Sequence, residues 1–362
     1  MASERRWRMR GLIWLGVTTP AVFGAFGIGA WLGVRWGVQA EPADWLYPRA
    51  VEMVRAEAQQ PGGRNAAVLY YREWHSVNQE SDFGLVRRLR AISEQRELNA
   101  QDLVQLGEGH MRHDIDRYAA ITGYADCDFD LEYERGFAHA HMHVVYMRFT
   151  GSLLGFDAER FALEGDGSNA ADRLVARLRL ARHISGARHV ISSMIAMNEV
   201  EQAADVIERW SECGLFDVDD AGRLSAQLRD LAASDFGMLE ALRMERLQGA
   251  ITFAKLSSHD GRWVGPEDDL ESWEMELGLR LDDTGARLTR GYEAALDMVI
   301  EAWPEPDGAE QISRAAAIVE AGPLDEPVQR AITLYAEQHA SMHELRERLL
   351  QIAALLDNGG QG

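Results

Sequence analysis

The chain has 362 residues, of which 46% are apolar and 26% are charged, proportions that are typical of an ordinary folded protein. Acidic residues outnumber basic ones by 58 to 37, and the formal net charge is -21 at pH 7. This composition argues against disorder over most of the chain. It also argues against a surface that binds nucleic acid through its phosphates, so we expect no nucleic-acid partner.

The first element in chain order is an apolar run without charges, residues 11–34. At about 1.5 Å per residue it is long enough to cross a hydrocarbon core of about 30 Å. Residues 1–10 form a basic tail that carries several arginines, whereas Arg35 is the single basic residue of the downstream flank. The positive-inside rule therefore predicts one transmembrane helix in a bacterial inner membrane, with a cytoplasmic N-terminus and a periplasmic C-terminal domain.

The alternative to this signal anchor is a cleaved signal peptide, because Val38-Gln39-Ala40 has the small residues of a cleavage site. The apolar run exceeds the usual length of about 7 to 15 residues for such a signal, which favours the anchor. Whether the chain is cleaved after Ala40 stays open. Residues 35–47 are then expected to form a linker.

Small residues recur at every fourth position along the expected membrane helix. Such a stripe would let a second transmembrane helix approach closely, as in a homodimer. The alternative is that glycine is simply frequent in membrane segments. The residues that would form this helix-packing face are Ala25, Gly29, Gly33 and Gly37.

Residues 48–357 show helical spacing of apolar residues, interrupted by short breaks rich in Gly, Asp or Pro, and no window shows the alternation of a strand. This pattern predicts an all-α extracytoplasmic domain, followed by a disordered tail at 358–362. An array of antiparallel helical hairpins, similar to tetratricopeptide repeats, is favoured over a four-helix bundle. The expected helices are 48–59, 65–77, 83–93, 99–121, 131–154, 170–183, 190–210, 221–233, 236–256, 270–281, 286–303, 309–321 and 326–357.

Residues 65 to about 250 carry a spread of short motifs: Ala66 to Tyr71, Asp126 to Phe129, Met142-His143, Leu178 to His183 and Ile191-Ser192. On these motifs the chain resembles a family of membrane-anchored, exported helical proteins of planctomycete-type bacteria. It departs from the family pattern at Met142, where a proline usually precedes the histidine. The resemblance implies an anchored helical fold similar to tetratricopeptide proteins and implies no catalytic role.

Histidines form the strongest candidate for chemistry. His139 and His143 are four residues apart and would share one face of a helix, and His110 and His113 lie on an earlier expected helix. Together they are candidate ligands for zinc or copper. The alternative is that His143 packs in the interior while His139 faces water, and no HExxH or di-iron motif supports the metal.

Two further clusters have a functional and a structural interpretation. Arg179, Arg182 and His183, with Arg148 on another helix, could bind an anion, although a network of ion pairs with the many carboxylates is favoured. Alternating carboxylates at 126, 128 and 130 begin like a calcium loop, but the turn glycine and the final glutamate are absent. There the carboxylates are expected to mark the start of a helix.

No motif of a serine hydrolase, a phosphate loop or a dinucleotide fold is present, so the sequence predicts no catalytic residue and no cofactor. Cys127 and Cys213 lack the spacing of a metal or redox site and could form one disulfide or remain separate buried thiols. We therefore expect a helical scaffold that binds a protein partner in the envelope. A metal-dependent envelope enzyme or metal-binding protein, using the histidines, is the alternative.

Overall fold

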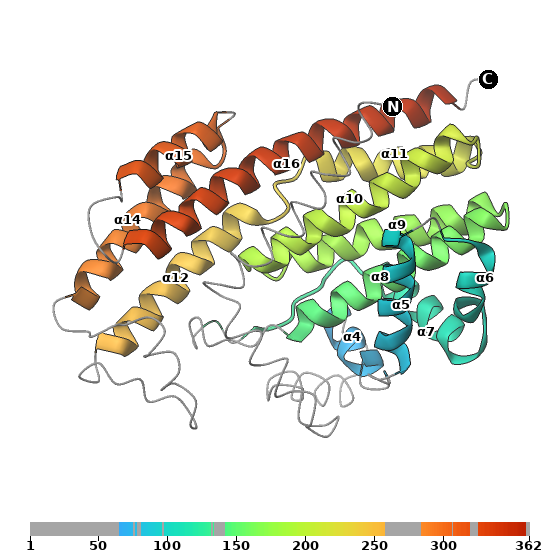
Figure 1. The fold of residues 1–362 in the computed structure, drawn as a ribbon, viewed down its shortest axis with the longest axis horizontal. Helices are drawn as coiled ribbons and strands as arrows, with labels where there is room; N and C mark the ends of the chain where they lie inside the picture. Colours follow the sequence, from blue (N-terminus) through green and yellow to red (C-terminus); the bar gives the residue numbers. More distant parts are fainter. Residues whose placement is uncertain are drawn as a thin grey trace. The chain divides into compact units, whose positions relative to one another are not determined.

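The computed structural model describes residues 65–74, 77, 81–95, 98–131, 133, 142–257, 284–305, 307–318 and 325–359. Within these ranges the fold is all-helical, as predicted, and the single β contact is an isolated bridge between Asn65 and Asp126 (Figure 1). No helix of the described ranges is long and apolar enough to span a membrane. The expected membrane helix at 11–34 lies outside these ranges.

The described residues divide into two compact units. The first, which we call the α9 unit, holds the described residues of Leu46–Leu131, Met142–Leu242 and Ala340–Gly362. The second, the α14 unit, holds those of Glu132–His141 and Arg243–His339. The division falls within two helices, α12 (Met238–Ser257) and α16 (Asp325–Gly359).

The α9 unit is built around one central helix, α9 (Gly167–Ser185), which packs against α8 (Met142–Leu163), α10 (Val190–Glu212) and α11 (Val218–Ala232) (Figure 1). The helices that precede this group are α4 (Ala66–Trp74), α5 (Ser81–Gln95), α6 (Ala100–Leu103), the short 3-10 helix η1 (Val104–Gly107) and α7 (Gly109–Ile121). The face of α9 predicted to be apolar is confirmed: Leu174, Leu178 and Ala181 are buried.

Helix ends in the α9 unit follow from capping side chains. Asp166 accepts a hydrogen bond from the Asn169 amide and begins α9, and Asp217 accepts one from the Asp220 amide and begins α11. Such caps satisfy amide groups that have no partner within the helix. Gly165, at φ +78°, lies in the short turn between α8 and α9. Helix α9 begins at Gly167, three residues before the start expected at 170.

An aromatic core lies where α4 meets α8. Trp74 is fully buried, stacks on Tyr70 and Tyr146, and donates to the Thr150 hydroxyl over 3.2 Å. Phe129, which follows α7, stacks on the same indole. Core packing is thus the role of Trp74, as it is of the buried Trp303 in the α14 unit.

Two predicted helices are wrong in their bounds. The helix expected at 99–121 is broken into α6, η1 and α7, because Glu108 is extended and Gly109 has φ +56°. The helix expected at 131–154 is instead α8, which begins at Met142 and continues to Leu163. Residues 126–131 are not helical, so no helix begins at Leu131 behind the carboxylates at 126, 128 and 130 as expected. The expected helices at 48–59 and 270–281 lie outside the described residues.

The α14 unit contains α14 (Thr284–Ala302), which packs against α15 (Gly308–Ile318), and parts of α12 and α16. Glu245 of α12 is buried and accepts hydrogen bonds from the hydroxyls of Tyr292 and Tyr335, which come from α14 and α16. Burial raises the pKa of Glu245 to about 7. One carboxyl group thus ties three helices of this unit together.

Candidate functional site

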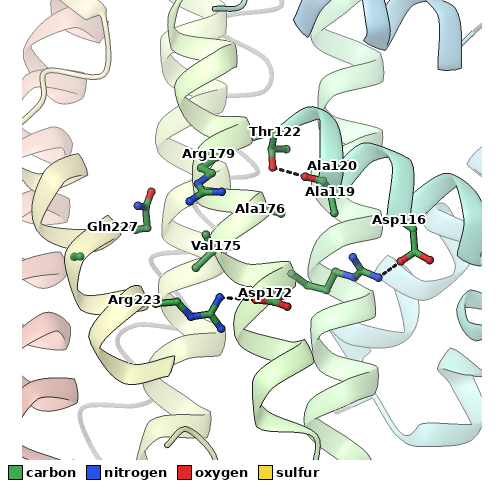
Figure 2. A pocket seen from close by; sticks show the side chains of 12 residues that line it. Asp116, Ala119, Ala120, Thr122, Asp172, Val175, Ala176, Arg179, Arg223 and Gln227 are labelled. Atoms are coloured by element: carbon green, nitrogen blue, oxygen red, sulfur yellow. Dashed lines mark hydrogen bonds and ion pairs between the residues drawn. The ribbon is translucent and has the colours of Figure 1, made fainter. Parts of the chain in front are cut away.

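A pocket of about 480 Å³ lies over α9 in the α9 unit (Figure 2). Helix α9 forms its floor, α7 with its C-cap Thr122 forms one wall, and α11 forms the other. We call it the α9 groove. Its lining residues are Asp116, Ala119, Ala120 and Thr122 from the α7 wall, Asp172, Arg173, Val175, Ala176 and Arg179 from α9, and Arg223, Ala226 and Gln227 from α11.

The floor follows from the helical repeat of α9. Asp172, Ala176 and Arg179 are spaced at i, i+4 and i+7, so they lie along one face of the helix. Asp172 and Arg179 are exposed, whereas the intervening Ala176 is small and lies low. A charged residue at each end and an alanine between them leave a hollow.

Ion pairs cross one end of the α9 groove in both directions. Arg223 of α11 donates to Asp172 of α9 over 2.6 Å, and Arg173 of α9 pairs with Asp116 of α7 (Figure 2). Arg173 also donates to the buried Asp157 of α8 over 2.8 Å. These pairs fix α7 and α11 against α9 and neutralise both lining carboxylates.

The other end of the α9 groove carries uncompensated polar groups. Arg179 is exposed and makes no hydrogen bond or ion pair within the described part of the chain. Figure 2 shows Gln227 on the α11 wall, at the level of Arg179 on the floor, and the Gln227 Oε1 atom is buried without a hydrogen-bond partner. A strong donor and an unused acceptor therefore line the same groove.

Arg182, one turn along α9, lies close enough to Arg179 for the two positive charges to repel each other. Arg182 also forms an ion pair with Asp230. Even so, burial and the nearby Arg179 charge lower the pKa of Arg182. An anionic group that approached Arg179 would relieve this repulsion.

The chemistry of the lining favours binding over catalysis. Both lining carboxylates are held by arginines, and the Thr122 hydroxyl donates to the Ala119 carbonyl over 2.7 Å. The α9 groove thus offers neither an activated nucleophile nor a free general base. It can recognise a ligand through charge, hydrogen bonds and the small apolar residues of its floor, Val175 and Ala176.

The predicted metal ligands are not brought together among the described residues. His110 and His113 are exposed on α7, with His110 Nε2 3.5 Å from the Asp82 carboxylate. His143 is buried in α8, where its Nε2 lies 3.3 Å from the Ser192 hydroxyl and its ring packs on Phe129. This burial agrees with the structural interpretation of His143.

No group of three or more His, Cys, Asp or Glu residues in the described ranges could hold a metal ion. His139 lies outside those ranges, so the four-histidine site stays a prediction. The expected membrane-packing residues also lie outside them: Ala25, Gly29, Gly33 and Gly37.

The predicted arginine and histidine cluster separates into structural and exposed members. His183 is buried between the Tyr70 hydroxyl, 3.1 Å from Nδ1, and the Tyr124 carbonyl, 2.9 Å from Nε2. Burial lowers its pKa, which suits a neutral packing role. Arg182 is paired with Asp230, as the network interpretation predicts, whereas Arg148 and Arg179 are exposed.

The cysteines form no disulfide with each other. Both are free, and Cys213 is exposed, so the expectation of two buried thiols is wrong for Cys213. Cys127 is half-buried, and burial raises the pKa of its thiol. The Cys127 thiol is therefore not activated for chemistry.

The sequence identifies Arg179 as a possible anion-binding residue, but it does not identify the residues of α7 and α11 that line the groove around it. Arg223 and Gln227 are 44 and 48 positions away on α11, and Asp116 is on α7, so only tertiary packing brings them to α9. A weak signal existed in the paired alanines Ala119-Ala120, which allow close approach at a helix surface. No known family, curated protein or solved structure matches the chain.

Proposed function

We propose that this protein is a helical scaffold whose α9 unit binds a segment of another polypeptide in the α9 groove. The observation that carries the proposal is that two unused polar groups line one groove: Arg179, which is exposed and has no hydrogen bond or ion pair among the described residues, and Gln227, whose Oε1 accepts no hydrogen bond there. A polypeptide supplies both complements, because its carbonyl or carboxylate oxygens accept and its amide N–H groups donate. The alanines of the groove allow its backbone to approach closely.

The arrangement of helices supports an interaction scaffold similar to tetratricopeptide repeats. The turns between α8 and α9, α9 and α10, and α10 and α11 are only a few residues long, and short turns join antiparallel neighbours. Stacked pairs of this kind expose a surface lined by successive helices. The α9 groove has this form, since three helices of the unit line it.

The sequence adds a location to this proposal. Residues 11–34 would anchor the chain in a bacterial inner membrane and place the α9 unit in the periplasm, with an envelope protein as the partner. Tethering to the membrane would raise the local concentration of the α9 groove near membrane-associated partners.

A photo-crosslinking amino acid at Ala226, on the α11 wall, tests the binding site in the full-length protein in its own membrane. We expect a discrete covalent adduct with a polypeptide, because Ala226 faces the bound segment. A matched probe at Leu355, an exposed residue of α16 that does not line the α9 groove, should give no such adduct.

A second substitution shows whether the adduct depends on the α9 groove. Ala119→Trp on the α7 wall should fill the space and abolish the adduct from Ala226, while circular dichroism confirms that the helices remain folded. Equal adducts from Ala226 and Leu355, or an adduct that Ala119→Trp leaves unchanged, would contradict the proposal.

A further inference from the structure

A second pocket, of about 370 Å³, lies between α4 and α7, next to the α9 groove. We call it the α4 pocket, because α4 supplies Leu69, Arg72 and Glu73 to its lining, opposite Arg117 of α7. Ala120 of α7 lines both pockets. The two hollows are therefore neighbours that meet at this residue.

Ala120 is the residue that lines both hollows. It is exposed and carries only a methyl group, and its neighbour Ala119 is equally small. No long side chain at this position divides the α9 groove from the α4 pocket. An extended backbone could pass over the last turn of α7 and occupy both.

The last turn of α7 offers few free carbonyl oxygens to repel an anionic segment. The Thr122 hydroxyl donates to Ala119 O over 2.7 Å, and the Gly123 amide donates to Ala120 O over 3.1 Å. The Tyr124 amide donates to Ile121 O over 3.2 Å. These bonds satisfy carbonyls that carry the negative end of the helix dipole.

The charge of the two linings is opposite to that of the chain. Together they contain five arginines against three carboxylates, whereas the chain as a whole has 37 basic and 58 acidic residues. Each carboxylate is already paired: Asp116 and Asp172 in the α9 groove, and Glu73 with Arg117 over 2.7 Å in the α4 pocket. Arg173 and Arg223 each hold a second carboxylate outside the linings, Asp157 and Asp220. The charge that a ligand can use is therefore that of Arg179, which has no ion pair among the described residues, and of Arg72 and Arg117, which share one glutamate.

Building on the proposed function, we infer that the bound polypeptide is an extended acidic segment that crosses α7 at Ala120, with one carboxylate on Arg179 and its chain continuing into the α4 pocket. Arg72 and Arg117 share Glu73 and would meet a second acidic group there. Tyr124, 41% exposed at the edge of the α4 pocket, would cover the segment with its ring. Charge complementarity at several arginines would give selectivity and a rate of association that falls with salt.

Binding of an acidic peptide is a stringent test for a specific site, because the protein carries a net charge of -21. Long-range electrostatics oppose the approach of an acidic peptide and favour a basic one. We therefore titrate the full-length protein with a fluorescein-labelled twelve-residue peptide of alternating glutamate and alanine, and with its lysine counterpart. We expect saturable binding of the glutamate peptide only, and weaker binding at higher salt.

Substitutions at Arg179 and Ala120 locate the bound peptide. Arg179→Glu should lower the affinity for the peptide by about tenfold or more, because it removes an attractive charge pair and introduces a repulsive one. Arg179→Lys should restore part of the affinity, and Arg314→Glu, an exposed position of the α14 unit, should have no effect. Ala120→Trp should lower the affinity for the twelve-residue peptide. It should not change the affinity for a four-residue version, which fits in the α9 groove alone.

Three results would overturn the inference: no saturable binding of the glutamate peptide, affinity unchanged by Arg179→Glu, or equal effects of Ala120→Trp on the long and short peptides. Inorganic polyphosphate that binds as tightly as the peptide would also overturn it, because a simple polyanion offers no N–H donor to Gln227. These failures are separate from failure of the proposed function. An Ala226 adduct that persists without acidic-peptide binding would leave the scaffold in place and remove only the ligand assignment.

Discussion

Arg177 donates to Glu199 Oε2 from both Nε and Nη2, over 2.9 and 2.7 Å, in the interior of the α9 unit. Their side chains are only 4% and 2% exposed. The pair lies against α8, where Gly151 and Gly155 leave space for the two charged groups. A second acceptor, Gln202 Oε1, holds the guanidinium from α10.

Removing one member of this pair should be strongly destabilising. Glu199→Ala would leave Arg177 buried without its counter-charge, which costs about 3–5 kcal/mol in the free energy of unfolding. Urea denaturation followed by circular dichroism measures this cost. As a control, Arg314→Ala breaks an exposed pair with Glu310 and should change the free energy of unfolding by less than about 1 kcal/mol.

The double substitution Arg177→Met with Glu199→Leu should recover most of the stability lost in Glu199→Ala. Apolar side chains of similar volume can replace a buried ion pair with little cost. A single Glu199→Ala variant as stable as the wild type would show that the pair is not buried as described.

The two glycines of α8 should resist substitution even though alanine favours helices. A Cβ atom at Gly155 would lie 2.4 Å from Arg177 Nη1, so Gly155→Ala must displace the guanidinium and should destabilise by about 1–3 kcal/mol. Gly222 of α11 is the matched control, because no atom lies within 4 Å of its Cβ position. Gly222→Ala should stabilise by up to about 1 kcal/mol. Thermal unfolding compares the two, and equal shifts would contradict the packing.

The stability of the α14 unit should fall as pH rises from about 4.5 to about 7. Burial raises the pKa of Glu245 from its ordinary 4.5 to about 7, and no basic residue of the described ranges pairs with it. The folded unit therefore binds a proton that the unfolded chain releases, so the stabilisation is complete below the unfolded pKa and is lost as pH rises through the folded one. The loss is on the order of 3 kcal/mol.

Glu245→Gln tests this linkage, since the amide can still accept from both tyrosine hydroxyls and does not ionise. Hydrogen exchange of the α14 amides should show a nearly flat pH dependence of opening in this variant after correction for intrinsic exchange. At pH 8 the variant should be more protected than the wild type. Glu301→Gln, an exposed position of α14, should retain the wild-type profile; a wild-type profile for Glu245→Gln as well would refute the linkage.

The sequence predicts the helices well where capping and periodicity act locally. Asn99 caps α6 through a capping box, and the helix ends at Ile121 and near Glu212 agree with expectation. The break at Glu108-Gly109 was not predicted, because a left-handed glycine inside an apolar repeat has no unique local signal. Burial of Arg177 was also hidden, since its neutralisation depends on Glu199 on another helix.

The α9 groove could be predicted only in part. Arg179 stands out as a charge on α9, but its neighbour Arg182 has the same sequence appearance and is paired with Asp230 on α11. Whether an arginine of α9 has an ion pair among the described residues depends on which residues the packing of α7 and α11 brings close. That information is long-range and is absent from the spacing along one helix.

The most direct test of the central claim is the amount of polypeptide that co-purifies with the detergent-solubilised full-length protein from its native membrane. We compare the wild type with Ala119→Trp, which fills the α9 groove, and with Leu355→Trp, which adds the same side chain at an exposed position outside it. The account predicts a stoichiometric partner with the wild type and Leu355→Trp, and its loss with Ala119→Trp. Retention of the same partner by folded Ala119→Trp, at the wild-type ratio, would contradict binding in the α9 groove.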